Sequence, residues 1–216
     1  MKYNLKRELP LLVILAIPFI AAIILYPHMP DRVPIHWNIR GEVDNYGSKA
    51  VGTFLLPLMN VALYLLFIIL PKFDPKRENY SKFDSSYVMI RYSLHLLFLL
   101  IFGVTVAVSL GYPVNVGKWI PAGVSVLFIV MGNIMGRVKP NYYVGFRFSW
   151  TLDNEEVWKK THKFGAKAVV IGGFAALFGV IFAGEIAGFV ILMAGILIPI
   201  IITAVYSYQI HKQITQ

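Results

Sequence analysis

The hydrophobic residues of this chain fall in long runs separated by shorter polar segments, with no period-2 alternation. Runs of about 18 or more apolar residues are typical of helices that cross the roughly 30 Å hydrocarbon core of a bilayer. The pattern therefore predicts six membrane-spanning helices: Leu9–Tyr26, Val51–Leu70, Tyr87–Leu110, Trp119–Met135, Phe164–Ala183 and Ile186–Tyr206.

The last two predicted spans are separated only by Gly184 and Glu185, so we expect them to form a tight helical hairpin. Lys167 falls in the first turn of the fifth predicted span, where its long side chain can reach the lipid headgroups. Lys2, Lys6 and Arg7 precede the first span, which is longer than the apolar part of a signal peptide and has no A-x-A site after it. An uncleaved signal anchor is the better interpretation.

Composition agrees with this pattern. Of 216 residues, 57% are hydrophobic and 14% are charged, whereas a soluble domain carries about 25% charged residues. The fold class that follows is an all-α integral membrane protein, a six-helix transmembrane bundle. There is no cysteine, so no disulfide framework is indicated.

The formal net charge of +9 is distributed unevenly along the chain. If the N-terminus is cytoplasmic, 16 of the Lys and Arg residues lie on the cytoplasmic side, and only Arg32, Arg40, Lys49 and Lys118 lie on the other. The positive-inside rule therefore predicts a multi-pass protein of the cell membrane with both termini in the cytoplasm. Because the excess charge is accounted for by topology, we expect membrane lipids as partners and no direct binding of nucleic acid.

Two polar segments stand out, one on each side of the membrane. Residues 27–50 form an extracytoplasmic loop whose prolines, glycines and asparagines indicate turns rather than a helix. Residues 137–165 form a cytoplasmic segment that is rich in aromatic residues. We divide the chain accordingly into residues 1–72, with two spans and the loop, and residues 73–216, with four spans and the cytoplasmic segment.

The cytoplasmic segment contains the pattern of a helix start. Asp153 is a candidate N-cap with Glu156 three residues later, and Glu155 and Lys159 stand in the favourable i,i+4 order. We expect an amphipathic helix at the inner interface that precedes the fifth span. The aromatic residues ahead of it suit an anchoring belt at headgroup level. Anchoring does not explain the polar residues between them.

This stretch, together with the first loop, resembles a known family. The pattern N-x3-G-x-R-x-x-W-T-L followed by W-x3-H-x2-G is similar to the signature of the SdpI immunity-protein family. The matching residues are Asn141, Gly145, Arg147, Trp150, Thr151, Leu152, Trp158, His162 and Gly165. The loop resembles the small domain of unknown function that often precedes this family, at Pro34, His36, Trp37, Asn38, Gly41, Asp44, Tyr46, Gly47 and Lys49.

One departure from the family pattern is visible, because Phe148-Ser149 stands where the family usually has Thr-Pro. The resemblance implies a polytopic membrane protein that protects its producer from a secreted killing peptide and that can hold an ArsR-type repressor at the membrane. It makes the matched loop residues candidates for binding a peptide toxin outside, namely Pro34, His36, Trp37, Asn38, Asp44, Tyr46 and Lys49. It makes the matched cytoplasmic residues candidates for binding the repressor inside, namely Asn141, Gly145, Arg147, Trp150, Thr151, Trp158 and His162.

Four polar residues lie inside the predicted spans: Asn60, Arg91, His95 and Asn133. Polar groups at this depth are costly and are functional candidates by default. Interhelical hydrogen bonding explains Asn60 and Asn133, at about 0.6 kcal/mol each, and snorkelling to the headgroups explains Arg91. His95 is either a packed core group or a protonation switch. If the four converge, a small proton-coupled transporter is an alternative function.

A second alternative is a membrane-embedded metal-dependent hydrolase, which would use the histidines and carboxylates of the loop. Their spacing matches no metal-ligand motif. The sequence also contains no Walker loop, no G-x-G-x-x-G motif and no adjacent nucleophile and base. We therefore expect no catalytic residues, no bound metal and no cofactor.

Overall fold

A computed structural model describes residues 5–215 of the chain; Lys2, which we counted among the basic residues of one side, lies outside them. Six of its helices are long and apolar enough to cross a membrane, so the six predicted spans are confirmed. They are α1 (Leu5–Leu25), α2 (Lys49–Phe73), α3 (Asp84–Ser109), α4 (Val116–Met135), α6 (Glu155–Phe182) and α7 (Glu185–Thr215).

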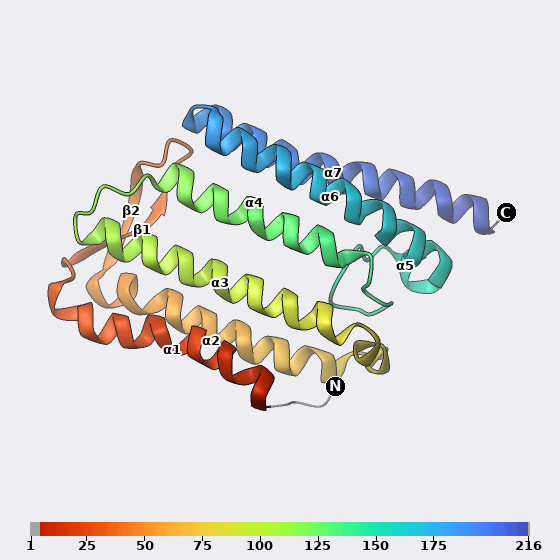
Figure 1. The fold of residues 1–216 in the computed structure, drawn as a ribbon, viewed down its shortest axis with the longest axis horizontal. Coiled ribbons are helices and arrows are strands. Elements are labelled where there is room, and N and C mark those ends of the chain that lie inside the picture. The colour runs from red at the N-terminus through yellow and green to blue at the C-terminus, as the bar shows by residue number, and fades with distance from the viewer. Residues whose placement is uncertain (1–4, 216) are drawn as a thin grey trace.

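The remaining elements lie at the two ends of the bundle (Figure 1). At one end, which we call the hairpin end, strands β1 (Arg32–Trp37) and β2 (Val43–Ser48) pair antiparallel between α1 and α2, with the short 3-10 turn Tyr26–His28 ahead of them. At the other, the signature end, lie the 3-10 turn Arg77–Phe83 and the short helix α5 (Ser149–Asp153). In Figure 1, α1 begins and α7 ends at the signature end.

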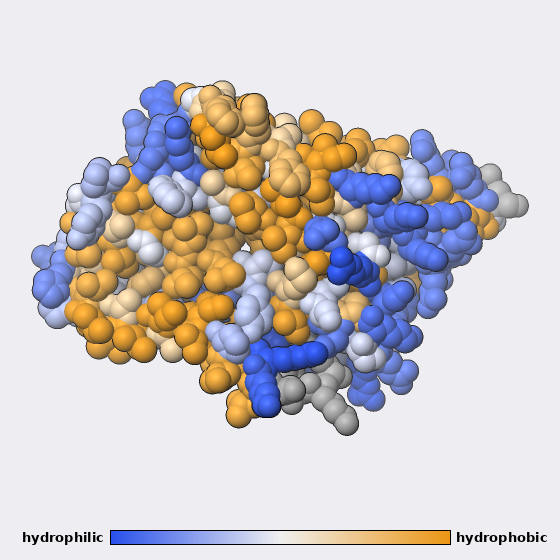
Figure 2. All heavy atoms as spheres, viewed as in Figure 1, coloured by the Kyte–Doolittle hydropathy of each residue, from blue (hydrophilic) through white to orange (hydrophobic). Residues whose placement is uncertain are grey.

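The surface has the distribution expected of a membrane bundle. Figure 2 shows hydrophobic residues across the middle of the molecule and hydrophilic ones gathered toward its ends. Large apolar side chains such as Ile23, Phe178 and Ile201 are more than half exposed. Exposure of this kind is unfavourable in water but suits contact with lipid tails.

The helices are held together by close packing. A Cβ atom on Gly172 of α6 would lie 2.1 Å from the carbonyl oxygen of Gly195 on α7, so these two backbones meet directly. Small residues permit this approach between helices in membranes. At the signature end a hydrophobic core joins α2, α3, α4 and α6, consisting of Phe67, Tyr80, Phe83, Tyr87, Ile90, Ile134, Val138 and Trp158.

Three details differ from our expectations. The amphipathic helix is not separate from the fifth span, because α6 runs without a break from Glu155 to Phe182. Its N-cap is Asn154 rather than Asp153, since Asn154 has an extended backbone and its side chain accepts from the N–H groups of Glu156 and Val157. Lys167 consequently lies well inside α6 rather than in its first turn. The loop of residues 27–50 contains paired strands as well as the expected turns.

Candidate functional site

At the signature end, Asn141 organises the irregular loop between α4 and α5. Its side chain is fully buried. Its Nδ2 group donates to the carbonyl oxygens of Lys139 and Val144, both at 2.9 Å, and its Oδ1 atom accepts from the N–H groups of Tyr143 and Val144. The amide therefore satisfies backbone groups that no regular element would satisfy, and it acts as a structural clamp.

His162 of α6 holds the next part of the same loop. Its Nδ1 atom lies 2.9 Å from the carbonyl oxygen of Trp158, and its Nε2 atom accepts from the N–H of Phe146 at 3.0 Å. These partners assign the neutral tautomer with the proton on Nδ1. The ring also stacks on Trp158, with centroids 4.0 Å apart. Gly145 is required here, because its φ is +117° and a Cβ atom would lie 2.3 Å from His162 Nε2.

The Trp-Thr part of the signature ties α5 to its neighbours. The Thr151 hydroxyl lies 2.9 Å from the carbonyl oxygen of Phe146 and accepts from the N–H of Phe148. Trp150 donates from Nε1 to the hydroxyl of Ser207 on α7 at 2.9 Å, and Thr161 donates to the same hydroxyl. These bonds place α5 against α6 and α7.

Sequence reasoning missed the residues that hold this loop from the opposite side. Asp74, which follows α2, is 2% exposed, and its carboxylate accepts from the Tyr80 hydroxyl and from the N–H of Tyr142, both at 2.9 Å. Asn79 donates to the carbonyl oxygen of Pro140, and Lys76 donates to that of Leu152. Because Asp74 lies in a short charged linker, its sequence context resembles a solvated turn.

Arg147 differs from its neighbours in the signature because it is exposed. Its guanidinium donates to the carbonyl oxygen of Tyr142, a residue that is 40% exposed. It does not share a pocket with His162, which is 1% exposed. Among the predicted residues of this segment, Arg147 is therefore the one with an exposed side chain, and Trp150 is half-buried.

At the hairpin end, β1 and β2 present an exposed polar face. His36 Nδ1 lies 2.5 Å from a carboxylate oxygen of Asp44, and both side chains are substantially exposed. Tyr46 is 44% exposed and lies beneath the guanidinium of Arg32, which is 5.2 Å from the ring centroid. The hairpin thus brings three of the predicted residues, His36, Asp44 and Tyr46, to a surface where they can contact a ligand.

The other predicted residues of the hairpin have structural surroundings. Pro34 is buried. Asn38 shapes the turn by accepting from the N–H groups of Arg40 and Glu42. Lys49 begins α2 and lies over the ring of Tyr26. Trp37 lines a hollow of about 230 Å³ between the hairpin and the ends of α4 and α7, and its Nε1 atom is buried without a hydrogen-bond partner among the described residues.

Within the bundle, Arg91 does not snorkel, contrary to our expectation. It is 2% exposed and forms a two-pronged ion pair with Glu8 of α1, at 2.7 and 2.6 Å. Tyr64 of α2 donates to the same carboxylate and lies beneath the guanidinium. Pairing removes the need for Arg91 to reach the headgroups, because a buried ion pair with good geometry offsets part of its desolvation.

His95 lies one turn beyond Arg91 on α3 and is fully buried. Its Nδ1 atom is 2.6 Å from Oδ1 of Asn60 on α2, so interhelical bonding is confirmed for Asn60. Asn133 does not join this group, because it is exposed on α4. Among the described residues, His95 Nε2, Asn60 Nδ2 and Arg91 Nε are buried without partners.

The histidines and carboxylates of the hairpin do not converge on a metal site. His36 and Asp44 form a pair, but within residues 5–215 no group of three or more His, Asp or Glu side chains is placed to hold an ion. The arrangement offers exposed hydrogen-bonding groups and an aromatic ring, which are means of binding a ligand.

Comparisons with known proteins give matches that include the hairpin and the signature segment. Residues 13–61 match a domain of unknown function, DUF1648, and residues 137–207 match the SdpI/YfhL protein family. The chain is 30% identical over 210 residues to "Immunity protein SdpI" of Bacillus subtilis (strain 168), which covers 97% of this chain and 98% of that protein.

A shorter similarity, 37% over 43 residues, relates the chain to "Uncharacterized membrane protein YbgB" of the same organism and covers 20% of this chain and 47% of that protein. No solved structure gives a significant match. The full-length similarity to SdpI, together with the family match over the signature segment, is decisive. The chain is a membrane protein that belongs to the SdpI/YfhL family.

Proposed function

We propose that this chain is an immunity protein of the cell membrane, which gives resistance to a secreted antimicrobial peptide. The observation that carries the proposal is the 30% identity over 97% of the chain to a protein named for immunity. The similarity includes the hairpin and the signature segment, so it is not limited to apolar helices that resemble one another by composition.

The hairpin is the part of the molecule that we assign to the peptide. Its exposed face combines a His–Asp pair with an aromatic ring and a cation, and the hollow beneath it is lined by Trp37, Ile120 and Phe189. Polar groups beside an apolar hollow suit a peptide with both apolar and polar side chains. In this proposal the His36–Asp44 pair and Tyr46 contact the peptide before it reaches its target in the bilayer.

The assignment requires that the hairpin lies outside the cell and the signature segment in the cytoplasm. Charge supports this orientation, since most Lys and Arg residues lie at the signature end. The chain contains no cysteine, so a single introduced cysteine is the only thiol in the protein that a labelling reagent can modify. A membrane-impermeant maleimide should label Tyr46→Cys in intact cells and should label Lys159→Cys only after lysis. The reverse pattern would refute the orientation.

Immunity is tested in Bacillus subtilis cells that lack their own SdpI. Cells expressing this chain should survive culture supernatant of the parent strain, and cells with the empty vector should not. A variant with both His36→Ala and Asp44→Ala should lose protection at unchanged protein level. Equal death of cells expressing the intact chain and vector cells, with the protein present in the membrane, would contradict the proposal.

The same protein can also signal, and we assign that role to Arg147. Its exposed cation at the signature end is available to a cytoplasmic ArsR-type repressor. An ArsR-type repressor co-expressed with this chain should move from the soluble to the membrane fraction when peptide is added. Arg147→Ala should abolish the shift without loss of immunity. No movement with the intact chain would remove the signalling role and leave immunity standing.

The geometry does not favour the transporter alternative. That hypothesis was motivated by four polar residues converging in the bundle. Asn133 lies on the surface of α4, and the charge of Arg91 is paired with Glu8. The remaining pair, Asn60 and His95, is accounted for by a hydrogen bond between α2 and α3.

A further inference from the structure

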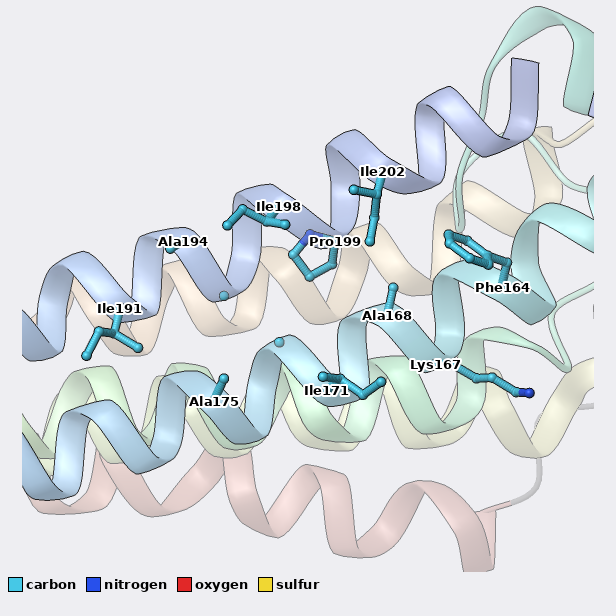
Figure 3. Close-up of a pocket in the computed structure, with 12 residues that line it drawn as sticks. Phe164, Lys167, Ala168, Ile171, Ala175, Ile191, Ala194, Ile198, Pro199 and Ile202 are labelled. Carbon is cyan, nitrogen blue, oxygen red and sulfur yellow. The ribbon is translucent and has the colours of Figure 1, made fainter. Parts of the chain in front are cut away.

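A large apolar groove runs between α6 and α7 on the outside of the bundle (Figure 3). Its volume is about 540 Å³. Small and branched apolar residues line most of it, with Ala168, Ile171 and Ala175 on one side and Ile191, Ala194 and Ile198 on the other. Near the signature end, Phe164 stacks on Tyr206 with ring centroids 4.2 Å apart.

One charged residue, Lys167, lines this groove. Its side chain extends toward the signature end in Figure 3. The residue is exposed, and among the residues that the structure describes no carboxylate lies within ion-pair distance of its amine. An unpaired cation on the lipid-facing side of a spanning helix needs an anion or water at its tip.

The length of α6 places this lysine relative to the membrane. With 28 residues at a rise of 1.5 Å, α6 is about 42 Å long, roughly 12 Å more than the hydrocarbon core. The excess corresponds to the charged first turns, which contain Glu155, Glu156, Lys159, Lys160 and Lys163. Lys167 then lies about one turn inside the hydrocarbon boundary, where a long side chain reaches the phosphate level by snorkelling.

We propose that this groove is a binding site for one anionic phospholipid. An acyl chain lies along the apolar groove between α6 and α7, and the phosphate group pairs with Lys167. The groove supplies apolar contact along its length, and the lysine supplies charge complementarity at one end. The site is separate from the hairpin, so it stands whether or not the chain confers immunity.

The groove suits a lipid chain better than a helix from a second copy. The glycines that would allow close helix packing are already used, because Gly172 and Gly195 face each other across the α6–α7 contact. An apolar helix seated in the groove would also cover Lys167 without neutralising it. A phospholipid fills the groove and neutralises the amine together.

Native mass spectrometry with equal phosphatidylglycerol and phosphatidylcholine tests the proposal. The intact chain should retain one phosphatidylglycerol in at least about fivefold preference. Lys167→Gln should remove the preference. Lys159→Gln, an exposed lysine on the same helix that does not line the groove, should keep it. Equal retention of both lipids by the intact chain, or unchanged preference in Lys167→Gln, would overturn the proposal.

A second pair of variants tests the acyl-chain contact. Ala175→Phe fills the groove and should reduce retention of both lipids, whereas Ala187→Phe adds the same bulk to an exposed position outside it and should not. Monodisperse elution and an unchanged melting midpoint show that each variant is folded. Crosslinking of an Ala194→Cys variant into covalent dimers, with no phosphatidylglycerol retained by the intact chain, would assign the groove to a second copy instead and refute the proposal.

Discussion

In the signature segment, the polar residues of the motif other than Arg147 lie inside the protein, whereas in the hairpin His36 and Asp44 face outward. Asn141 and Thr151 are fully buried, and every atom of the Asn141 amide is engaged by backbone groups. The side chains of His36 and Asp44 are 67% and 41% exposed. A motif of polar residues is therefore not in itself a binding surface. Here most of the signature motif holds a loop in place, whereas the hairpin exposes polar side chains at its surface.

The largest expected effect comes from Gly145→Ala in the signature segment. The new Cβ atom would lie 2.3 Å from His162 Nε2 at a φ of +117°. Backbone strain and overpacking should together lower the free energy of unfolding by about 3 kcal/mol or more. Thermal unfolding of the purified protein measures the loss. Gly184→Ala is the matched control, because nothing lies within 4 Å of its added Cβ atom.

A smaller effect is expected for Asn141→Ala. This change leaves backbone groups of the loop without partners, which should destabilise the protein by about 2–3 kcal/mol. Asn133→Ala removes an exposed amide and should change stability by less than about 0.5 kcal/mol. If the two variants melt at the same temperature, Asn141 is not the clamp of the loop, and the contrast between the two ends of the molecule weakens.

The six spans could be predicted from sequence because the length of an apolar run is a local property. The rotation of each helix could not, since lipid-facing and core-facing sides are both apolar and leave no amphipathic stripe. For this reason the position of Asn133 along its helix could be predicted from the sequence, but the exposure of its side chain could not. The Glu8–Arg91 pair joins residues far apart in the chain, and Glu8, beside Lys6 and Arg7, resembles part of a solvated basic terminus.

The candidate sites were predictable to a similar extent. The sequence motifs located the signature loop and the hairpin. They did not distinguish residues whose buried side chains hold the backbone in place from residues whose exposed side chains can contact a ligand. Asp74 was missed because a carboxylate in a short linker ordinarily faces water. Its burial depends on Tyr80 and on the N–H of Tyr142, which the chain brings together only in the folded bundle.

For the hairpin, the expected change is in function rather than in stability. His36→Ala removes an exposed side-chain contact with Asp44, and exposed polar pairs contribute about 0–1 kcal/mol, so the melting midpoint should move little. Protection against the killing peptide should fall toward that of vector cells. Arg40→Ala, at the exposed turn of the same hairpin, should retain protection. Full protection by His36→Ala would mean that the exposed pair does not contact the peptide.

The smallest effect on stability is expected for Arg147→Ala, because this residue of the signature is exposed whereas Asn141, Thr151 and His162 are buried. The guanidinium is exposed and donates to one carbonyl oxygen, so its loss should change the free energy of unfolding by less than about 0.5 kcal/mol. If the buried residues of the motif serve to position the exposed Arg147, this variant should fold and protect cells, yet fail to hold the repressor at the membrane. Lys163→Ala removes an exposed charge from the same end and should leave that recruitment intact. A melting midpoint lowered as far as that of Asn141→Ala would place Arg147 among the residues that build the loop.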